Sequence, residues 1–306
     1  MLSKDKKSVR PPSLKQGDTI GIVAPAGPFD PDKFMKGKAV LESMGFQTIF
    51  DDSIFQKNGF LAGTDLQRAD QVNHLFADPS VQAIICARGG YGSMRILSLL
   101  DFETIQENPK IFLGFSDISV LLSVLYDQCG LVTFHGPLVT TLARATEKTI
   151  MAMKTALGSD APLELIPEDG TVIKPGVCSG LMAGGNLTTL CHLVGTPFAP
   201  NFKGKILLLE DVGEMPYRID RMLTQMKLAG CFDDMAGMIL GAFKECGQLN
   251  EIVDIFNSIF EDTNIPILAG FDIGHGIHNL TIPMGMGAKL DTDKKQLLFH
   301  EPATVA

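Results

Sequence analysis

The first half of the chain alternates short apolar runs with segments of helical spacing, and this alternation restricts the fold more than any other feature. The apolar runs predict strands at residues 18–27, 46–50, 81–87, 111–115 and 131–135. Helical spacing predicts intervening helices at about 31–44 and, behind a capping box at Thr64, at 64–76. Strands that alternate with helices form a parallel sheet covered on both faces, and ligands bind at the carboxyl ends of such strands.

The length of 306 residues favours two domains over one. Residues 161–178 contain several prolines and glycines among isolated apolar residues, so they are the expected linker. We therefore predict an N-terminal domain at 1–160 and a C-terminal domain at 179–306. The second half should contain a helix opened by Gly184-Gly185-Asn186, strands at 206–209, 238–243 and 265–271, helices at 217–228 and 252–260, and a hairpin at 288–299.

The composition narrows the range of partners. A formal net charge of -9 argues against nucleic acid or an anionic membrane as the main partner, because both are bound through basic surfaces. No apolar stretch reaches the roughly 20 residues that a membrane span needs. Residues 1–12 lack the apolar run of a secretory signal. These features predict a cytoplasmic protein.

The six cysteines are scattered along the chain without a Cys-x-x-Cys pair. This spacing predicts small buried apolar residues, and neither a disulfide framework nor a zinc site.

The strand predicted at 111–115 runs directly into Ser116 and then into a helical segment. A serine at a strand-to-helix corner has an exposed hydroxyl and backbone N–H groups close by, which suits a nucleophile. The alternative is that Ser116 only caps the helix, because serine is a preferred N-cap residue. The stretch Gly114-Phe115-Ser116-Asp117-Ile118 also lacks the second glycine of the hydrolase nucleophile elbow.

A glycine-rich turn, Arg88-Gly89-Gly90-Tyr91-Gly92-Ser93, follows the third predicted strand. Glycines allow successive N–H groups to face an anion or a developing oxyanion. A phosphate-binding nest and a plain structural turn are the alternatives. The glycine spacing matches neither common nucleotide-binding motif.

Glu210 and Asp211 stand where another apolar strand is expected to end, and His275 lies among glycines after the last core strand. Glu210 could orient a histidine or could form a salt bridge with Arg218 or Arg221. His278 is the alternative to His275 as the functional histidine. The His275-x-x-His278 spacing also suggests a metal site, but no nearby cysteine or carboxylate pattern completes one. Serine, glutamate and histidine in this chain order match the hydrolases that work by acyl transfer.

Six motifs, in order and spacing, resemble the serine L,D-carboxypeptidases of peptidase family S66, the muramoyltetrapeptide carboxypeptidases. The resemblance covers about residues 18–290. The motifs are Ala24-Pro25-Ala26-Gly27, Arg88-Gly89-Gly90-Tyr91-Gly92, Gly114-Phe115-Ser116-Asp117, His135-Gly136-Pro137, Leu209-Glu210-Asp211 with Tyr217-Arg218-Ile219-Asp220-Arg221, and Gly274-His275.

The resemblance implies an α/β fold with a Rossmann-like parallel-sheet N-terminal domain that carries the serine. A smaller α/β C-terminal domain would carry the glutamate and histidine. Ser116 matches the nucleophile, His275 the general base and Glu210 the residue that orients it. The backbone N–H groups of Gly90 and Asp117 match the oxyanion hole. Arg88, Gly89 and Tyr91 are the substrate-binding candidates, with Arg88 suited by its charge to the terminal carboxylate.

The implied activity is release of the terminal D-alanine from cell-wall tetrapeptides, at the bond after meso-diaminopimelate or lysine. The resemblance implies no metal and no cofactor, and a cytoplasmic homodimer in peptidoglycan recycling. One branch of the family instead hydrolyses aminoacyl-adenylate analogues of the microcin C type and uses a tryptophan to stack on the nucleobase, whereas this chain has none. A non-catalytic anion-binding module is the remaining alternative.

Overall fold

The computed structural model describes residues 7–306, which divide into two compact units. The first unit contains 7–160 together with Thr281–Gly285 and Ala303–Ala306. The second unit contains Ala161–Leu280 and Met286–Pro302. The prediction that residues 1–12 carry no secretory signal falls partly on residues 1–6, which lie outside the described residues.

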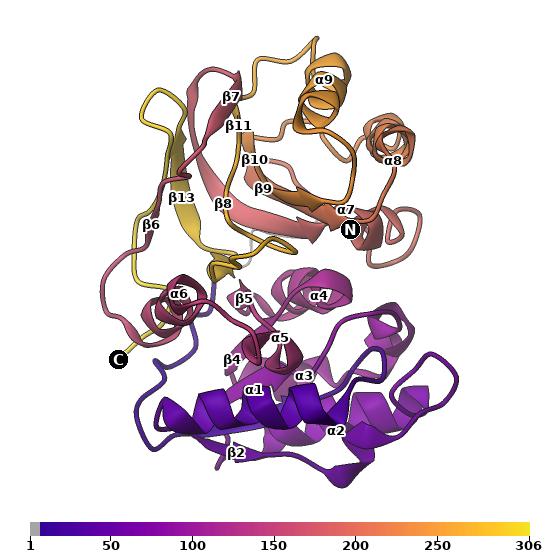
Figure 1. The fold of residues 1–306 in the computed structure, drawn as a ribbon, viewed down its shortest axis with the longest axis vertical. Helices are drawn as coiled ribbons and strands as arrows, with labels where there is room; N and C mark the ends of the chain where they lie inside the picture. Colours follow the sequence, from indigo (N-terminus) through magenta and orange to yellow (C-terminus); the bar gives the residue numbers. More distant parts are fainter. Residues whose placement is uncertain (1–6) are drawn as a thin grey trace. The chain divides into compact units, whose positions relative to one another are not determined.

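The first unit is built on a six-stranded sheet in the order β12-β5-β4-β3-β1-β2 (Figure 1). Five strands are parallel, and β12 pairs antiparallel with β5 at one edge. The loops after β1, β3 and β4 therefore lie at one edge of the sheet. The strands are β1 (Thr19–Val23), β2 (Gln47–Ile49), β3 (Ala83–Cys86), β4 (Ile111–Gly114), β5 (Thr133–His135) and β12 (Ile282–Met284).

Helices of the first unit connect these strands. Helix α1 packs against α5, and α3 packs against both α2 and α4. Helix α2 begins with the predicted capping box between Thr64 and Gln67. The helices are α1 (Pro31–Ser43), α2 (Asp65–Ala77), α3 (Phe102–Glu107), α4 (Ser119–Cys129), α5 (Val139–Leu142) and α6 (Glu147–Gly158), with 3-10 turns η1 (Asp52–Phe55), η2 (Ser93–Leu99) and η3 (Ser116–Ile118).

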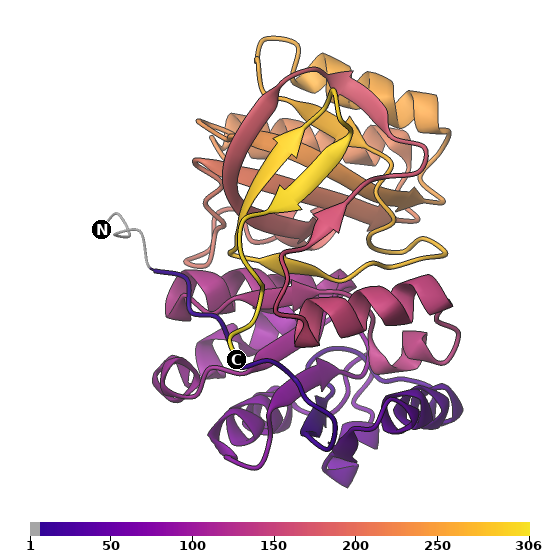
Figure 2. The ribbon, with the colours of Figure 1, turned by 90° about the vertical axis from the view of Figure 1, so that its left-hand side faces the viewer.

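The second unit contains an eight-stranded sheet in the order β6-β14-β13-β8-β9-β10-β11-β7. Figure 2 shows the paired strands near the end of the chain in yellow. Strands β8, β9, β10 and β11 run parallel, and the flanking strands are antiparallel to their neighbours. The strands are β6 (Glu164–Leu165), β7 (Thr171–Lys174), β8 (Val177–Asn186), β9 (Lys205–Val212), β10 (Gly237–Lys244), β11 (Ile267–Ala269), β13 (Gly287–Asp291) and β14 (Gln296–Phe299).

Three helices accompany this sheet: α7 (Leu187–Cys191), α8 (Pro216–Leu228) and α9 (Leu249–Ile259). Their apolar side chains, including Leu223 and Phe256, join one core cluster with Leu207 and Leu240 of the central strands. The molecule thus has the α/β class expected from the sequence, with a parallel-sheet first unit and a smaller α/β second unit.

Several predictions from the sequence can be compared with single elements of the structure. The hairpin is confirmed as β13 paired with β14. Residues 161–178, expected as a linker, contain β6, β7 and the first residues of β8. All six cysteines are free; four are buried as predicted, whereas Cys178 and Cys231 are only half-buried. Within the described residues, no helix is both long enough and apolar enough to span a membrane.

Candidate active site

Ser116 is the first residue after the corner between β4 and η3, and its backbone has a φ of 64°. A non-glycine residue in this left-handed region is strained, and such strain is concentrated at functional sites. Helix α4 begins three residues later, with Ile118 at its N-cap position. The alternative in which Ser116 caps the helix is therefore wrong.

The glycine-rich turn passes directly beside the Ser116 side chain. A Cβ atom added to Gly89 would lie 2.9 Å from Ser116 Cβ and 3.0 Å from Ser116 Oγ. Glycine at this position therefore lets the backbone approach the hydroxyl. The Gly89 carbonyl accepts a 3.0 Å hydrogen bond from Gly27 N–H, which joins the turn to the loop after β1.

Asp117 links the same turn to the serine corner through its side chain. Its buried carboxylate accepts a 2.8 Å hydrogen bond from the N–H of Ser93. Burial raises the pKa of the Asp117 carboxyl, while the bonds from Ser93 and the charge of Arg68 act in the opposite direction. The Ser116 corner and the 88–93 turn are therefore braced against each other.

Two exposed side chains extend from the 88–93 turn. The guanidinium of Arg88 donates to the carbonyl of Pro28. The Tyr91 ring is half exposed and packs edge-on against Phe60, with ring centroids 5.4 Å apart. Both side chains belong to the turn that contacts Ser116, so they remain candidates for substrate contacts.

Glu210 and His275 form a hydrogen-bonded pair in the second unit. Glu210 Oε2 lies 2.7 Å from His275 Nδ1 and also accepts a 3.2 Å hydrogen bond from the His275 backbone N–H. Glu210 is fully buried, and the His275 side chain is 19% exposed. A carboxylate on Nδ1 favours the tautomer in which Nε2 accepts a proton, which is the arrangement of a general base.

Gly274 makes this contact possible. A Cβ atom added to Gly274 would lie 2.3 Å from Glu210 Oε2, and its φ of 96° is in the region that favours glycine. Its N–H donates to Asn279 Oδ1 at 2.8 Å, which fixes the loop before His275.

The structure corrects two expectations about Glu210. Strand β9 runs to Val212, so Glu210 lies within the strand and not after its end. The salt-bridge alternative is also wrong, because Arg218 pairs with Glu214 at 3.5 Å and Arg221 stacks over the Tyr217 ring. The carboxylate of Glu210 is instead bound by His275 and Asn186.

Asn186 is a candidate site residue that the sequence pattern indicates only as the start of a helix. Its Nδ2 donates to Glu210 Oε1 at 3.3 Å and to Asp211 Oδ1 at 3.1 Å. Asp211 also accepts from the N–H and hydroxyl of Thr188, and burial raises the pKa of its carboxyl. A single amide thus lies between two buried carboxylates, one of which orients His275.

Each unit therefore assembles part of the predicted set. The first unit brings together Ser116, Gly89 and the Asp117 carboxylate, and the second brings together Glu210 and His275. Among residues 7–306, no group of three or more His, Cys, Asp or Glu side chains is arranged to hold a metal ion.

Comparison with known proteins points to one family. The family model of the LD-carboxypeptidase N-terminal domain matches residues 20–136, and that of the LD-carboxypeptidase C-terminal domain matches 179–290. The chain is 37% identical to a probable murein peptide carboxypeptidase of Bacillus subtilis (strain 168), over 95% of this chain and 94% of that protein.

Two solved structures have folds similar to that of this chain. MccF in complex with glutamyl sulfamoyl guanosine has a TM-score of 0.90 at 26% identity, covering 97% of this chain and 99% of that chain. A muramoyltetrapeptide carboxypeptidase from Oxalobacter formigenes has a TM-score of 0.81 at 28% identity, covering 92% and 97%.

Proposed function

The chain belongs to the LD-carboxypeptidase family, peptidase S66, and on that premise we propose that it releases the terminal D-alanine from murein tetrapeptides by a Ser-His-Glu mechanism. The observation that carries this proposal is the left-handed backbone of Ser116 beside the Gly89 turn. Such a corner presents a hydroxyl for attack and places backbone N–H groups next to it.

In the proposed reaction, His275 Nε2 removes the proton of Ser116 as the hydroxyl oxygen attacks the carbonyl before the D-residue. The backbone N–H groups of Gly90 and Asp117 hold the oxyanion. His275 then protonates the leaving amine of D-alanine, and water, activated by the same imidazole, hydrolyses the acyl-enzyme. Glu210 holds the imidazole by Nδ1 and stabilises its charged form.

Binding of the peptide needs a group for its terminal carboxylate and a surface for its chain. Arg88 carries the positive charge suited to the carboxylate, and Gly89 and Tyr91 offer backbone and ring contacts in the same turn. Bidentate binding by a guanidinium would select a free C-terminus, which is what a carboxypeptidase requires.

The test is D-alanine release from a defined murein tetrapeptide, together with labelling by a fluorophosphonate. Wild type should release D-alanine and take up one label on the peptide that contains Ser116. Ser116→Ala should lose both, whereas Ser123→Ala, a serine farther along α4, should keep both. Labelling of Ser116→Ala at the wild-type rate would refute the assignment of the nucleophile.

A second candidate substrate is an aminoacyl sulfamoyl nucleoside, because the likeness to MccF bound to glutamyl sulfamoyl guanosine extends over 97% of this chain. Stacking on a nucleobase is strongest for tryptophan, and the chain contains none. Greater identity to a murein peptide carboxypeptidase supports the tetrapeptide. Parallel kcat/KM measurements on the tetrapeptide and on a glutamyl sulfamoyl nucleoside decide between the two.

We assign the proposed reaction to peptidoglycan recycling in the cytoplasm, since tetrapeptides arise when wall material is degraded. The working form is proposed to be a homodimer. Light scattering on the purified protein tests the dimer, and fractionation of producing cells tests the compartment.

A further inference from the structure

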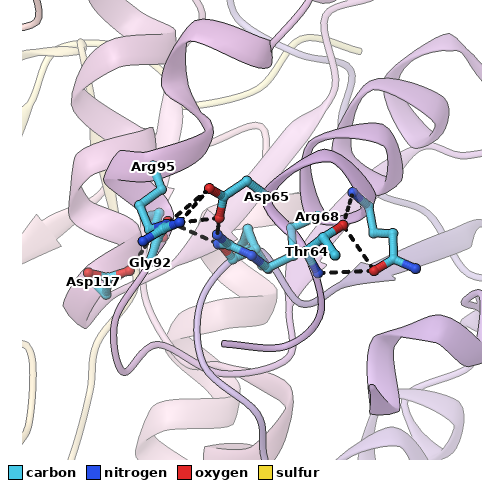
Figure 3. A network of polar contacts seen from close by, with 9 residues as sticks. Thr64, Asp65, Arg68, Gly92, Arg95 and Asp117 are labelled. Atoms are coloured by element: carbon cyan, nitrogen blue, oxygen red, sulfur yellow. Dashed lines mark hydrogen bonds and ion pairs between the residues drawn. The ribbon is translucent and has the colours of Figure 1, made fainter. Parts of the chain in front are cut away.

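Arg68 of helix α2 is a fully buried arginine next to the glycine-rich turn. Its Nη1 donates to the carbonyls of Pro25 and Gly92, the latter at 2.9 Å, and its Nη2 donates to Asp65 Oδ1 at 2.5 Å (Figure 3). One guanidinium therefore joins the loop after β1, the turn after β3 and helix α2.

The peptide group between Gly92 and Ser93 is held from both sides. Its carbonyl accepts from Arg68, and its N–H donates to the Asp117 carboxylate at 2.8 Å (Figure 3). A Cβ atom added to Gly92 would lie 2.9 Å from Arg68 Nη1, so glycine is needed for this approach. We call this arrangement the Arg68–Asp117 clamp.

Burying the positive charge of Arg68 costs desolvation free energy, which lowers the stability of the fold. Its carboxylate partner, Asp65, is 29% exposed and is shared with Arg95, whose guanidinium lies 2.8 Å away. Among residues 7–306, Arg68 Nε has no hydrogen-bond partner. Replacing a buried ion pair by apolar side chains is often neutral or stabilising, so a stabilising role explains Arg68 poorly.

We propose that Arg68 is a positioning residue that fixes the 88–93 turn, so that Gly90 N–H stays aligned beside Ser116. Asp117 supplies the opposite half of the clamp with its side chain, while its own N–H is the second proposed oxyanion donor. This inference rests on the proposed function for its catalytic consequence, but the fixing of the turn can be measured without it.

Arginine suits this role better than lysine. Its planar fork donates in fixed directions to two carbonyls and a carboxylate, whereas an ammonium on a flexible stem is a single point charge. We therefore expect Arg68→Lys to retain only part of the clamp, and Arg68→Met to lose it.

Hydrogen exchange tests the clamp directly. In Arg68→Met, amides of residues 88–93 should exchange at least about tenfold faster than in wild type. The matched control is Lys110→Met. Lys110, just before β4, is also a buried cation of the first unit, but it donates to the carbonyls of Leu75 and Asp78 at the carboxyl end of α2. That variant should leave exchange of the 88–93 turn unchanged.

Kinetics test the consequence for catalysis. Arg68→Met should lower kcat for D-alanine release by about 10²-fold, as does loss of an oxyanion donor, with little change in KM. Lys110→Met should change neither constant beyond its effect on the folded fraction. If Arg68→Met does not fold, Arg68→Lys should show the same two changes at smaller size.

The outcomes separate the two proposals. Unchanged exchange of the 88–93 turn in the Arg68 variants, or equal acceleration in Lys110→Met, overturns the clamp. Faster exchange without a fall in kcat overturns its role in positioning. A wild-type protein that releases no D-alanine refutes the proposed function, and exchange then still decides whether Arg68 fixes the turn.

Discussion

Glu210 Oε2 lies 2.7 Å from His275 Nδ1, while Glu210 Oε1 accepts a hydrogen bond from Asn186. Both oxygens of this fully buried carboxylate are thus used as acceptors. An amide in place of the carboxylate would offer one acceptor oxygen, so either His275 or Asn186 would face a second donor.

Glu210→Gln is therefore expected to lower kcat for D-alanine release by about 10²- to 10⁴-fold, because the amide permits the wrong imidazole tautomer and carries no negative charge. KM should change little. Steady-state kinetics on a murein tetrapeptide measure both constants. Glu214→Gln is the control, since Glu214 pairs with Arg218 outside the site and its loss should not change kcat.

The two nearby histidines should differ sharply. His275 contacts Glu210 through Nδ1, so His275→Ala is expected to lower kcat by at least about 10³-fold. His278→Ala should stay close to wild type. The same assay distinguishes them, and an equal loss in both variants would mean that Glu210 does not identify the general base.

The fold of the first unit is largely predictable because alternation of strands and helices is local information. Strand β12 is the exception: three residues far along the chain pair with β5, and their sequence carries no sign of that partner. The left-handed backbone conformation of Ser116 also could not be predicted from the sequence, since serine rarely adopts it.

The position of Ser116 at a corner after a strand was predictable, because the apolar run of β4 ends just before it. Contacts between side chains from distant segments were not predictable. Arg68 looks like any polar residue of an amphipathic helix, and only the folded chain places it against Gly92. Asn186 likewise shows its second partner, Asp211, only after β8 and β9 pair.

Gly274 provides a test of how closely the loop must approach Glu210. Gly274→Ala adds a Cβ that would lie 2.3 Å from Glu210 Oε2, so we expect displacement of the carboxylate and loss of activity. Gly213→Ala is a matched control, because Gly213 has a φ of 72° with nothing within 4 Å of an added Cβ.

The control should lose only about 1–2 kcal/mol of the free energy of unfolding, from its strained backbone, and should keep its kcat. Chemical denaturation and the D-alanine assay measure the two effects. Equal kcat in both variants would mean that Glu210 moves aside without consequence.

The pH dependence of stability should reveal the buried Asp117. Burial raises the pKa of this carboxyl above its ordinary value of 3.8. Its contribution to the free energy of unfolding is therefore fully present below the unfolded pKa and is lost as the pH rises through the folded pKa. Asp117→Asn keeps an oxygen that can accept from Ser93 but cannot ionise.

We therefore expect the free energy of unfolding of Asp117→Asn, minus that of wild type, to become more positive as the pH rises above the ordinary carboxyl pKa of 3.8. Urea denaturation at each pH measures it. Asp234→Asn is the control, because the hydrogen bond from Lys203 lowers the pKa of the exposed Asp234 carboxyl, so its difference from wild type should change chiefly below the ordinary pKa of 3.8 and stay nearly constant above it. A difference for Asp117→Asn that stays constant or falls over this range would mean that the Asp117 carboxyl ionises as readily in the fold as in the unfolded chain, and that the clamp holds its carboxylate without penalty.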